Sequence, residues 1–216
     1  MKKRVLCYGD SNTWGYIPGQ GLRYEEDVRW TGVCQAALGP GYQIIEEGLS
    51  GRTTVFDIPW AQCRNGLSGL GYALQAQAPL DLAIICLGTN DLVMKETRHI
   101  ALGADKLVRV TLNADRIFDP PQPIFPEKPR VLLVAPAPFH PVVEQRPDSP
   151  AHGKYQASRQ LAALYREIAA ARGVDFLDAG QYARPSEVDG VHLTPESHAR
   201  LGRAMAQTIR AILAPA

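Results

Sequence analysis

The sequence has no strong charge of either sign, since 23 Lys and Arg residues stand against 22 Asp and Glu residues, for a formal net charge of +1 at pH 7. The basic residues are scattered along the chain, so we expect no binding to nucleic acid. The chain also lacks a hydrophobic run long enough to cross a bilayer, so we expect no membrane segment. With 45% hydrophobic and 21% charged residues, the composition is that of a soluble globular protein.

Cysteine is scarce, and the four that occur form no C-x-x-C pair: Cys7, Cys34, Cys63 and Cys86. Cys7 and Cys86 lie inside apolar runs without a neighbouring histidine, so we interpret them as buried thiols in a reducing compartment. Basic residues at positions 2–4 are followed by only a short apolar run, residues 5–8, which is too short for the core of a signal peptide. Together these features predict a cytoplasmic protein.

Five short apolar runs rich in Val, Ile and Leu show no alternation with polar residues, a pattern typical of parallel strands covered on both faces. They span residues 4–8, 43–47, 80–87, 130–135 and 174–177. Helical patterns span residues 29–38, 100–118, 155–172 and 198–213. This alternation predicts a three-layer α/β/α sandwich with a central five-stranded parallel sheet. No linker or repeat divides the chain, so we expect residues 1–216 to form a single domain; two proline-rich stretches, 119–129 and 136–150, are interpreted as stiff loops.

Three polar motifs stand where predicted strands end or where the last helix begins. Gly9-Asp10-Ser11 follows the first strand, and Gly88-Thr89-Asn90-Asp91 follows the third. Because sites in parallel sheets form at the carboxyl ends of the strands, we expect Ser11 and Asn90 at one edge. Asp189-Gly190-Val191-His192 lies in the loop before the last helix, for which Thr194 is a suitable N-cap and Pro195 a suitable first residue.

These motifs supply the groups that serine-based acyl transfer requires. Ser11 is the candidate nucleophile, His192 its general base and later its general acid, and Asp189 the carboxylate that orients the imidazole. Each motif alone is also a plausible turn or cap, but no other Ser/His/Asp grouping competes. The Walker A loop, G-x-S-x-G and H-E-x-x-H are absent, and no residues have metal-ligand spacing, so we expect neither a metal nor a cofactor.

In these residues the chain resembles the SGNH (GDSL-type) hydrolases along nearly its whole length. Family block I is Gly9-Asp10-Ser11-Asn12, the block II glycine lies within residues 46–52, block III is residues 88–91, and block V is residues 189–192. The resemblance implies the family's flavodoxin-like fold. It also implies an oxyanion hole made by the backbone N–H of Ser11, the N–H of Gly51 and the side chain of Asn90, with Gly48 as the alternative for the second donor.

Residues 27–32, 46–54 and 79–82 are similar to the bacterial arylesterase/acyltransferase subgroup of that family. That subgroup usually has Leu-Thr-Trp after the block I serine, where this chain has Asn12-Thr13-Trp14, and residues 136–150 do not match it well. The resemblance implies an esterase for small acetyl or short-chain esters, such as aryl esters or acetylated carbohydrates. An acyl-enzyme would pass its acyl group to water or to an alcohol, and the resemblance alone also implies a homo-oligomer.

Two alternatives to this function remain open from the sequence. One is a thioesterase or lysophospholipase of the same family, which would need a long apolar groove. The other is a catalytically idle fold that binds carbohydrate, although Ser11, Asn90, Asp189 and His192 are all present.

Four further residues are candidates for contact with substrate, each with a structural alternative. Trp14 would wall the acyl pocket or pack in the core, and Arg52 would line the site or form a buried salt bridge. Asn65 stands in an Asn-Gly pair that is typical of a turn, although the subgroup has a similar pair near its site. His140 would reach substrate from a proline-rich loop or simply be exposed.

Two more positions close to the motifs are interpreted structurally. Tyr16 is assigned to core packing, and Asp10 and Asp91 are assigned to the capping of turns. The remaining histidines lack a matching carboxylate.

Overall fold

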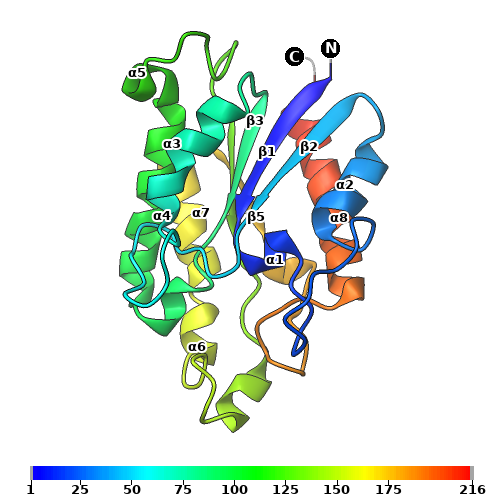
Figure 1. The fold of residues 1–216 in the computed structure, drawn as a ribbon, viewed down its shortest axis with the longest axis vertical. Coiled ribbons are helices and arrows are strands. Elements are labelled where there is room, and N and C mark those ends of the chain that lie inside the picture. The colour runs from blue at the N-terminus through cyan, green and yellow to red at the C-terminus, as the bar shows by residue number, and fades with distance from the viewer. Residues whose placement is uncertain (1, 215–216) are drawn as a thin grey trace.

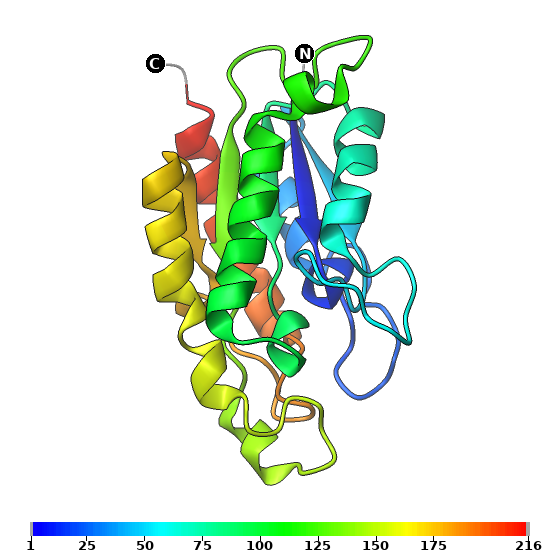
Figure 2. The ribbon, with the colours of Figure 1, turned by 90° about the vertical axis from the view of Figure 1, so that its left-hand side faces the viewer.

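The computed structural model describes residues 2–214, which form a five-stranded sheet covered by helices on both faces (Figures 1 and 2). The strands are β1 (Lys3–Gly9), β2 (Tyr42–Gly48), β3 (Leu82–Cys86), β4 (Val131–Ala135) and β5 (Asp175–Asp178). They pair in parallel in the order β2-β1-β3-β4-β5. The predicted strands and the fold class are therefore confirmed, with each boundary within two residues of the expected one.

The two faces of the sheet follow from the alternation of side chains along each strand. Leu6 and Tyr8 of β1 belong to one core cluster, and Val5 and Cys7 belong to the other. The first cluster is covered by α3 (Gly66–Ala76), α4 (Thr97–Leu112) and α7 (Leu161–Arg172); the second is covered by α2 (Trp30–Leu38) and α8 (Pro195–Ile212). Figure 1 shows these two helical layers on opposite sides of the sheet.

Helix boundaries differ from the prediction where polar side chains interrupt a helical pattern. The predicted helix over residues 100–118 begins earlier, as α4, and is divided at Asn113, whose side chain donates to Arg109 O at 2.9 Å; α5 (Ala114–Phe118) follows. The predicted helix over residues 155–172 is also divided, into α6 (Tyr155–Ser158) and α7. Ser158 Oγ donates to Tyr155 O at 2.6 Å, a local bond that competes with helix continuation.

The interpretation of Asn65-Gly66 as a turn is wrong, because Asn65 is the N-cap of α3. Its Oδ1 accepts from the N–H groups of Leu67 and Ser68. Three glycines within α3 hide the helical pattern in the sequence, since glycine is a poor helix former. Gly66 and Gly71 are needed for close packing: a Cβ on Gly66 would lie 2.5 Å from Thr53 O, and one on Gly71 would lie 2.7 Å from the ring of Phe118.

The remaining elements are short, and the sequence did not indicate them. They are α1 (Ser11–Trp14), which follows β1, and three 3-10 turns at Asp91–Val93, Pro141–Gln145 and Ala179–Gln181. None of the helices within residues 2–214 combines the length and the apolar character needed to cross a membrane.

The strand order places a crevice beside β1. From β1 the chain passes to β2 at one edge and then returns to β3 on the other side of β1, so the connections after β1 and β3 diverge. Such a switch point is where open α/β sheets bind ligands. Ser11 directly follows β1 and Asn90 follows β3, so both lie at this carboxyl edge, as expected.

Candidate active site

The one-turn helix α1 presents Ser11 at the end of β1. Asp10 caps this turn, because its Oδ1 accepts from the backbone N–H of Asn12 at 2.9 Å, in agreement with its predicted role. Gly15 ends the turn in the left-handed region, with φ of +91°. Ser11 is 3% exposed, and its own backbone N–H has no hydrogen-bond acceptor among residues 2–214. A free donor therefore lies beside the buried hydroxyl.

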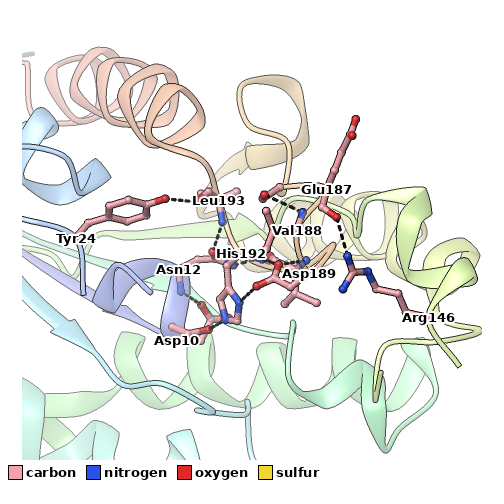
Figure 3. Close-up of polar contacts among 12 residues, drawn as sticks. Asp10, Asn12, Tyr24, Arg146, Glu187, Val188, Asp189, His192 and Leu193 are labelled. Atoms are coloured by element: carbon pink, nitrogen blue, oxygen red, sulfur yellow. Dashed lines mark hydrogen bonds and ion pairs between the residues drawn. The ribbon is translucent and has the colours of Figure 1, made fainter. Parts of the chain in front are cut away.

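A continuous line of hydrogen bonds joins Ser11, His192 and Asp189. The Nε2 atom of His192 lies 3.0 Å from Ser11 Oγ. Its Nδ1 lies 2.8 Å from Asp189 Oδ2, a contact between two residues labelled in Figure 3. An ionised carboxylate can only accept a hydrogen bond, so the Nδ1 of His192 carries the proton and donates it to Asp189. The lone pair of Nε2 then faces the hydroxyl of Ser11. Ser11 and His192 are 181 positions apart in the chain.

Asp189 is fixed by its second oxygen as well. Its Oδ1 accepts from the backbone N–H groups of Val191 and His192, each at 2.9 Å. Burial disfavours the charge on Asp189, but its bonds to the His192 ring and to these two N–H groups outweigh burial and lower its pKa. The carboxylate is therefore ionised at neutral pH and orients the imidazole.

Asn90 and Gly51 lie on the loops that follow β3 and β2. Asn90 Nδ2 donates one hydrogen to Arg52 O at 2.9 Å, which orients the amide, and its second hydrogen has no acceptor among residues 2–214. Gly51 has φ of +81°, and its N–H, like that of Ser11, has no acceptor within the described part of the chain. Gly48 instead serves close packing, because it pairs with Gly9 at the end of β2 and a Cβ there would lie 2.3 Å from Trp14 N.

Arg52 is buried and forms no salt bridge within residues 2–214, so the alternative of a buried salt bridge is wrong. Its guanidinium lies 4.0 Å from the ring centre of Tyr8, and its Nη1 donates to Gly9 O at 2.8 Å and to Glu47 O. Burial lowers the pKa of Arg52. Because the carbonyls at the ends of β1 and β2 accept from its Nη1, this cation supports the base of the site.

Asp91 joins two loops at the site, whereas the sequence predicted that it caps a turn. Its carboxylate accepts from Thr54 N–H, at 3.0 Å and 3.1 Å to its two oxygens, and from the Thr54 hydroxyl. Asp91 is fully buried, and burial raises its pKa to about 6. The loop after β2 is thereby held against the loop after β3, next to Asn90.

The assignment of Tyr16 to core packing is wrong. Its ring stacks on the imidazole of His192, with 4.1 Å between ring centres and 26° between the planes. Trp14 is half-buried beside Tyr16, at 6.3 Å between ring centres, and the guanidinium of Arg23 lies over the Trp14 ring, 5.3 Å from its centre. Tyr16 thus reaches the imidazole of His192 directly, which residue type alone did not indicate.

The other two candidates for substrate contact have polar atoms engaged elsewhere. Asn65 Nδ2 donates to Val55 O at 3.1 Å and to Asp57 Oδ1 at 3.2 Å, in addition to the helix cap made by its oxygen. His140 Nδ1 accepts from Val142 N–H at 3.2 Å. Its backbone N–H donates to Gly190 O at 2.9 Å, so the proline-rich loop docks on the loop that carries His192.

Within residues 2–214, no group of three or more His, Cys, Asp or Glu side chains is arranged to hold a metal ion. Sequence reasoning gave Asn12 no role at the site and placed Tyr16 in the core, although both contact the loop around His192. The signal that pointed to them was their closeness in sequence to Ser11.

Comparison with solved structures gives close matches over almost the whole chain. A carbohydrate acetylesterase from Sinorhizobium meliloti is 41% identical, with a TM-score of 0.87, and the match covers 98% of this chain and 100% of that one. The native aryl esterase of M. smegmatis is 39% identical, with a TM-score of 0.87 and the same coverage. A carbohydrate acetylesterase family member from Sinorhizobium meliloti is 36% identical, with a TM-score of 0.87, over 99% of this chain and 100% of that one.

A search of curated protein sequences gives no significant match. The model of the GDSL-like lipase/acylhydrolase family matches residues 7–200, a span that includes Ser11, Asn90, Asp189 and His192. With the solved relatives, this match leads to one conclusion: the chain belongs to the GDSL-like lipase/acylhydrolase family.

Proposed function

We propose that the protein is a serine esterase in which Ser11, His192 and Asp189 form the catalytic triad. The observation that carries this proposal is the line of hydrogen bonds from Ser11 Oγ through the imidazole to Asp189, at 3.0 Å and 2.8 Å. A serine hydroxyl is a weak nucleophile at neutral pH unless a base lies within hydrogen-bond reach. That requirement is met here in a buried setting.

The reaction proceeds through an acyl-enzyme. Ser11 Oγ attacks the carbonyl carbon of the ester while its proton passes to His192 Nε2. The tetrahedral intermediate then breaks its bond to the leaving oxygen, which takes the proton from Nε2 and departs as an alcohol. Water repeats the sequence on the acyl-enzyme: it gives a proton to His192, and the proton returns to Ser11 as the carboxylic acid leaves. Asp189 stabilises the imidazolium at each stage.

Three donors are proposed to stabilise the oxyanion of the tetrahedral intermediate. They are the backbone N–H groups of Ser11 and Gly51 and the unused amide hydrogen of Asn90. The absence of acceptors for these N–H groups within residues 2–214 supports the assignment. Removal of one such donor typically costs about 10²- to 10³-fold in kcat.

The proposed substrates are small carboxylic esters with acetyl or short acyl groups, on an aryl alcohol or a carbohydrate. The support comes from relatives described as an aryl esterase and as carbohydrate acetylesterases, at 36–41% identity over nearly the whole chain. Alcohols are proposed as acyl acceptors beside water. Trp14, Arg52, Asn65 and His140 stay predictions as substrate-binding residues, and Trp14 is the best placed of them because it lies beside Tyr16.

The test is a panel of p-nitrophenyl esters of increasing acyl length, thioesters, lysophospholipid and acetylated sugars, run on the wild type and on Ser11→Ala. We expect turnover of the short esters, with a loss of at least about 10³-fold in Ser11→Ala. An organophosphonate should label the folded wild type at Ser11 only. A protein that binds acetylated sugar without turnover or adduct would instead be a carbohydrate-binding module, and a preference for long-chain thioesters would indicate a thioesterase.

Three further proposals accompany this function. Residues 1–216 form a single domain, the protein is a homo-oligomer, and it is located in the cytoplasm. The last is supported by the four cysteines, all unpaired. Size-exclusion chromatography with light scattering tests the oligomer, because a single species of 23.6 kDa would contradict it.

A further inference from the structure

Asn12 bridges the turn that carries Ser11 and the loop that carries His192. Its Oδ1 accepts from the backbone N–H of Leu193 at 3.0 Å, a contact visible in Figure 3, and its Nδ2 donates to Val191 O at 3.3 Å. Val191 and Leu193 are the two sequence neighbours of His192. One side-chain amide therefore holds the peptide groups on both sides of the imidazole.

The loop around His192 is ordered internally by other bonds. The N–H of His192 donates to Asp189 Oδ1 at 2.9 Å, and its carbonyl accepts from Ser186 N–H at 2.8 Å. These bonds lie within residues 186–192, so they shape the loop but do not fix its distance from Ser11. Within the described chain, three hydrogen bonds join residues 11–14 to residues 186–194: the bond from Ser11 to His192 and the two made by Asn12.

Asn12 is itself well placed to anchor this loop. It is half-buried, it is the residue after Ser11, and its backbone N–H is fixed by the Asp10 carboxylate that caps α1. The contact from Tyr24 Oη to Leu193 O is long at 3.5 Å, and Tyr16 contacts the imidazole through its ring face rather than the backbone of the loop. Within residues 2–214, the two hydrogen bonds that tie the backbone of this loop to the turn carrying Ser11 thus come from a single amide.

We propose that Asn12 is a positioning residue that sets the Ser11–His192 distance through the peptide groups flanking His192. This inference rests on the proposed function, because it presumes that Ser11 and His192 exchange a proton. Proton transfer needs a donor–acceptor distance of about 2.6–3.2 Å. A displacement of about 1 Å in such a pair is expected to cost about 10²-fold in rate.

The test begins with Asn12→Leu, which has a similar size but neither polar atom. On p-nitrophenyl acetate we expect kcat to fall about 10²-fold with KM unchanged, because substrate contacts are preserved. The kcat of Asn12→Ala, which introduces no bulk, should fall to a similar extent. This variant replaces Asn12→Leu in the test if the leucine variant folds poorly. Asn113→Leu is the matched control: it removes an asparagine that also makes two side-chain hydrogen bonds, at the junction of α4 and α5, and should keep the wild-type kcat.

A double-mutant cycle with His192→Ala separates positioning from a general structural effect. If Asn12 acts through the imidazole, Asn12→Leu should cause no further loss once His192 is replaced. A further loss of about 10²-fold in the His192→Ala background would overturn the inference, as would a wild-type kcat in Asn12→Leu and Asn12→Ala. Full activity in Ser11→Ala or His192→Ala would instead overturn the proposed function, and this inference with it.

Discussion

The imidazole of His192 is held at its face as well as at its two nitrogens. Ser11 and Asp189 bond its edge, and the ring of Tyr16 covers one face at 4.1 Å between centres. Stacking of this kind contributes about 1 kcal/mol beyond area burial. It also covers a face of the imidazole that the two edge bonds do not contact.

Replacement of Tyr16 by leucine should therefore lower kcat on short esters by about 10-fold, because about 1 kcal/mol of support for the reactive ring orientation is lost. Steady-state kinetics on p-nitrophenyl acetate measures the effect. Tyr16→Phe is the control: the Tyr16 hydroxyl makes no hydrogen bond within residues 2–214, so the phenylalanine should keep nearly the full rate. Equal losses in both variants would contradict a role for the stack.

His198 makes stability depend on pH, independently of catalysis. It is fully buried in the first turn of α8, and its Nδ1 accepts from the backbone N–H of Trp30 at 3.2 Å. Burial, together with the charges of Arg29 and His192, lowers its pKa to about 4, against 6.5 for a free histidine. Between these values the unfolded chain binds a proton that the folded chain does not, so acidification favours unfolding.

His198→Asn keeps an acceptor for Trp30 but does not titrate. As the pH falls from about 6.5 to about 4, the free energy of unfolding of the wild type should drop by about 3 kcal/mol relative to this variant. Below that range the difference should become constant. Denaturant titrations at several pH values measure the difference in free energy of unfolding between the wild type and this variant. The contributions of the other ionisable groups cancel in this difference. A difference that does not change with pH would show that His198 is accessible to protons in the folded state.

At the residue scale, the sequence predicts the groups that belong to contiguous motifs. Ser11, Asn90 and His192 each stand at the end of a strand or before a helix, where the fold itself implies a common edge. Asn12 and Tyr16 escape such reasoning for a physical reason. Their partners lie about 180 positions away in the chain. In addition, Asn12 bonds backbone groups, which every residue has, so the sequence does not indicate which residues it contacts.

At the scale of the elements, α3 begins at a single side-chain cap, Asn65. Its oxygen satisfies two free N–H groups at the start of the helix, and its Nδ2 ties down the preceding loop through Val55 O and Asp57. Asn65→Ala should lower the free energy of unfolding by about 1 to 2 kcal/mol, since both functions are lost. Urea denaturation measures this effect.

Asn65→Ser separates the two functions of this side chain. Serine is a good N-cap but cannot donate to Val55 O from the same position, so its stability should lie between those of the wild type and the alanine variant. Serine and alanine variants of equal stability would mean that the cap contributes nothing measurable.

The inner strands β1, β3 and β4 were predictable because both of their faces are buried along most of their length, which leaves continuous apolar runs. The edge strands β2 and β5 are only partly buried and carry a shorter apolar signal. Helix α3 was not predictable from the sequence, because Gly66, Gly69 and Gly71 allow close packing but lower the helix propensity of the segment. The division of α4 from α5 likewise depends on a hydrogen bond from Asn113 to Arg109 O, which forms only once the helix exists.

At the scale of the whole molecule, three of the four cysteines report whether the second core cluster is shielded from solvent. Cys7, Cys34 and Cys86 lie buried between the sheet and the helices α2 and α8, whereas Cys63 is exposed. Burial raises the pKa of Cys34 to about 12 and also raises those of Cys7 and Cys86. Because the thiolate is the reactive form, these three thiols should be inert unless the layers separate.

The native protein should therefore release one equivalent of thionitrobenzoate from Ellman's reagent, and denatured protein should release four, one for each cysteine in the chain. Cys63→Ser should release none while folded. In moderate urea the three buried thiols should react together, at a rate set by global unfolding, since each is covered by the same two helices. Faster reaction of Cys34 alone would mean instead that α2 opens by itself, so that the second core cluster does not unfold as one cooperative unit.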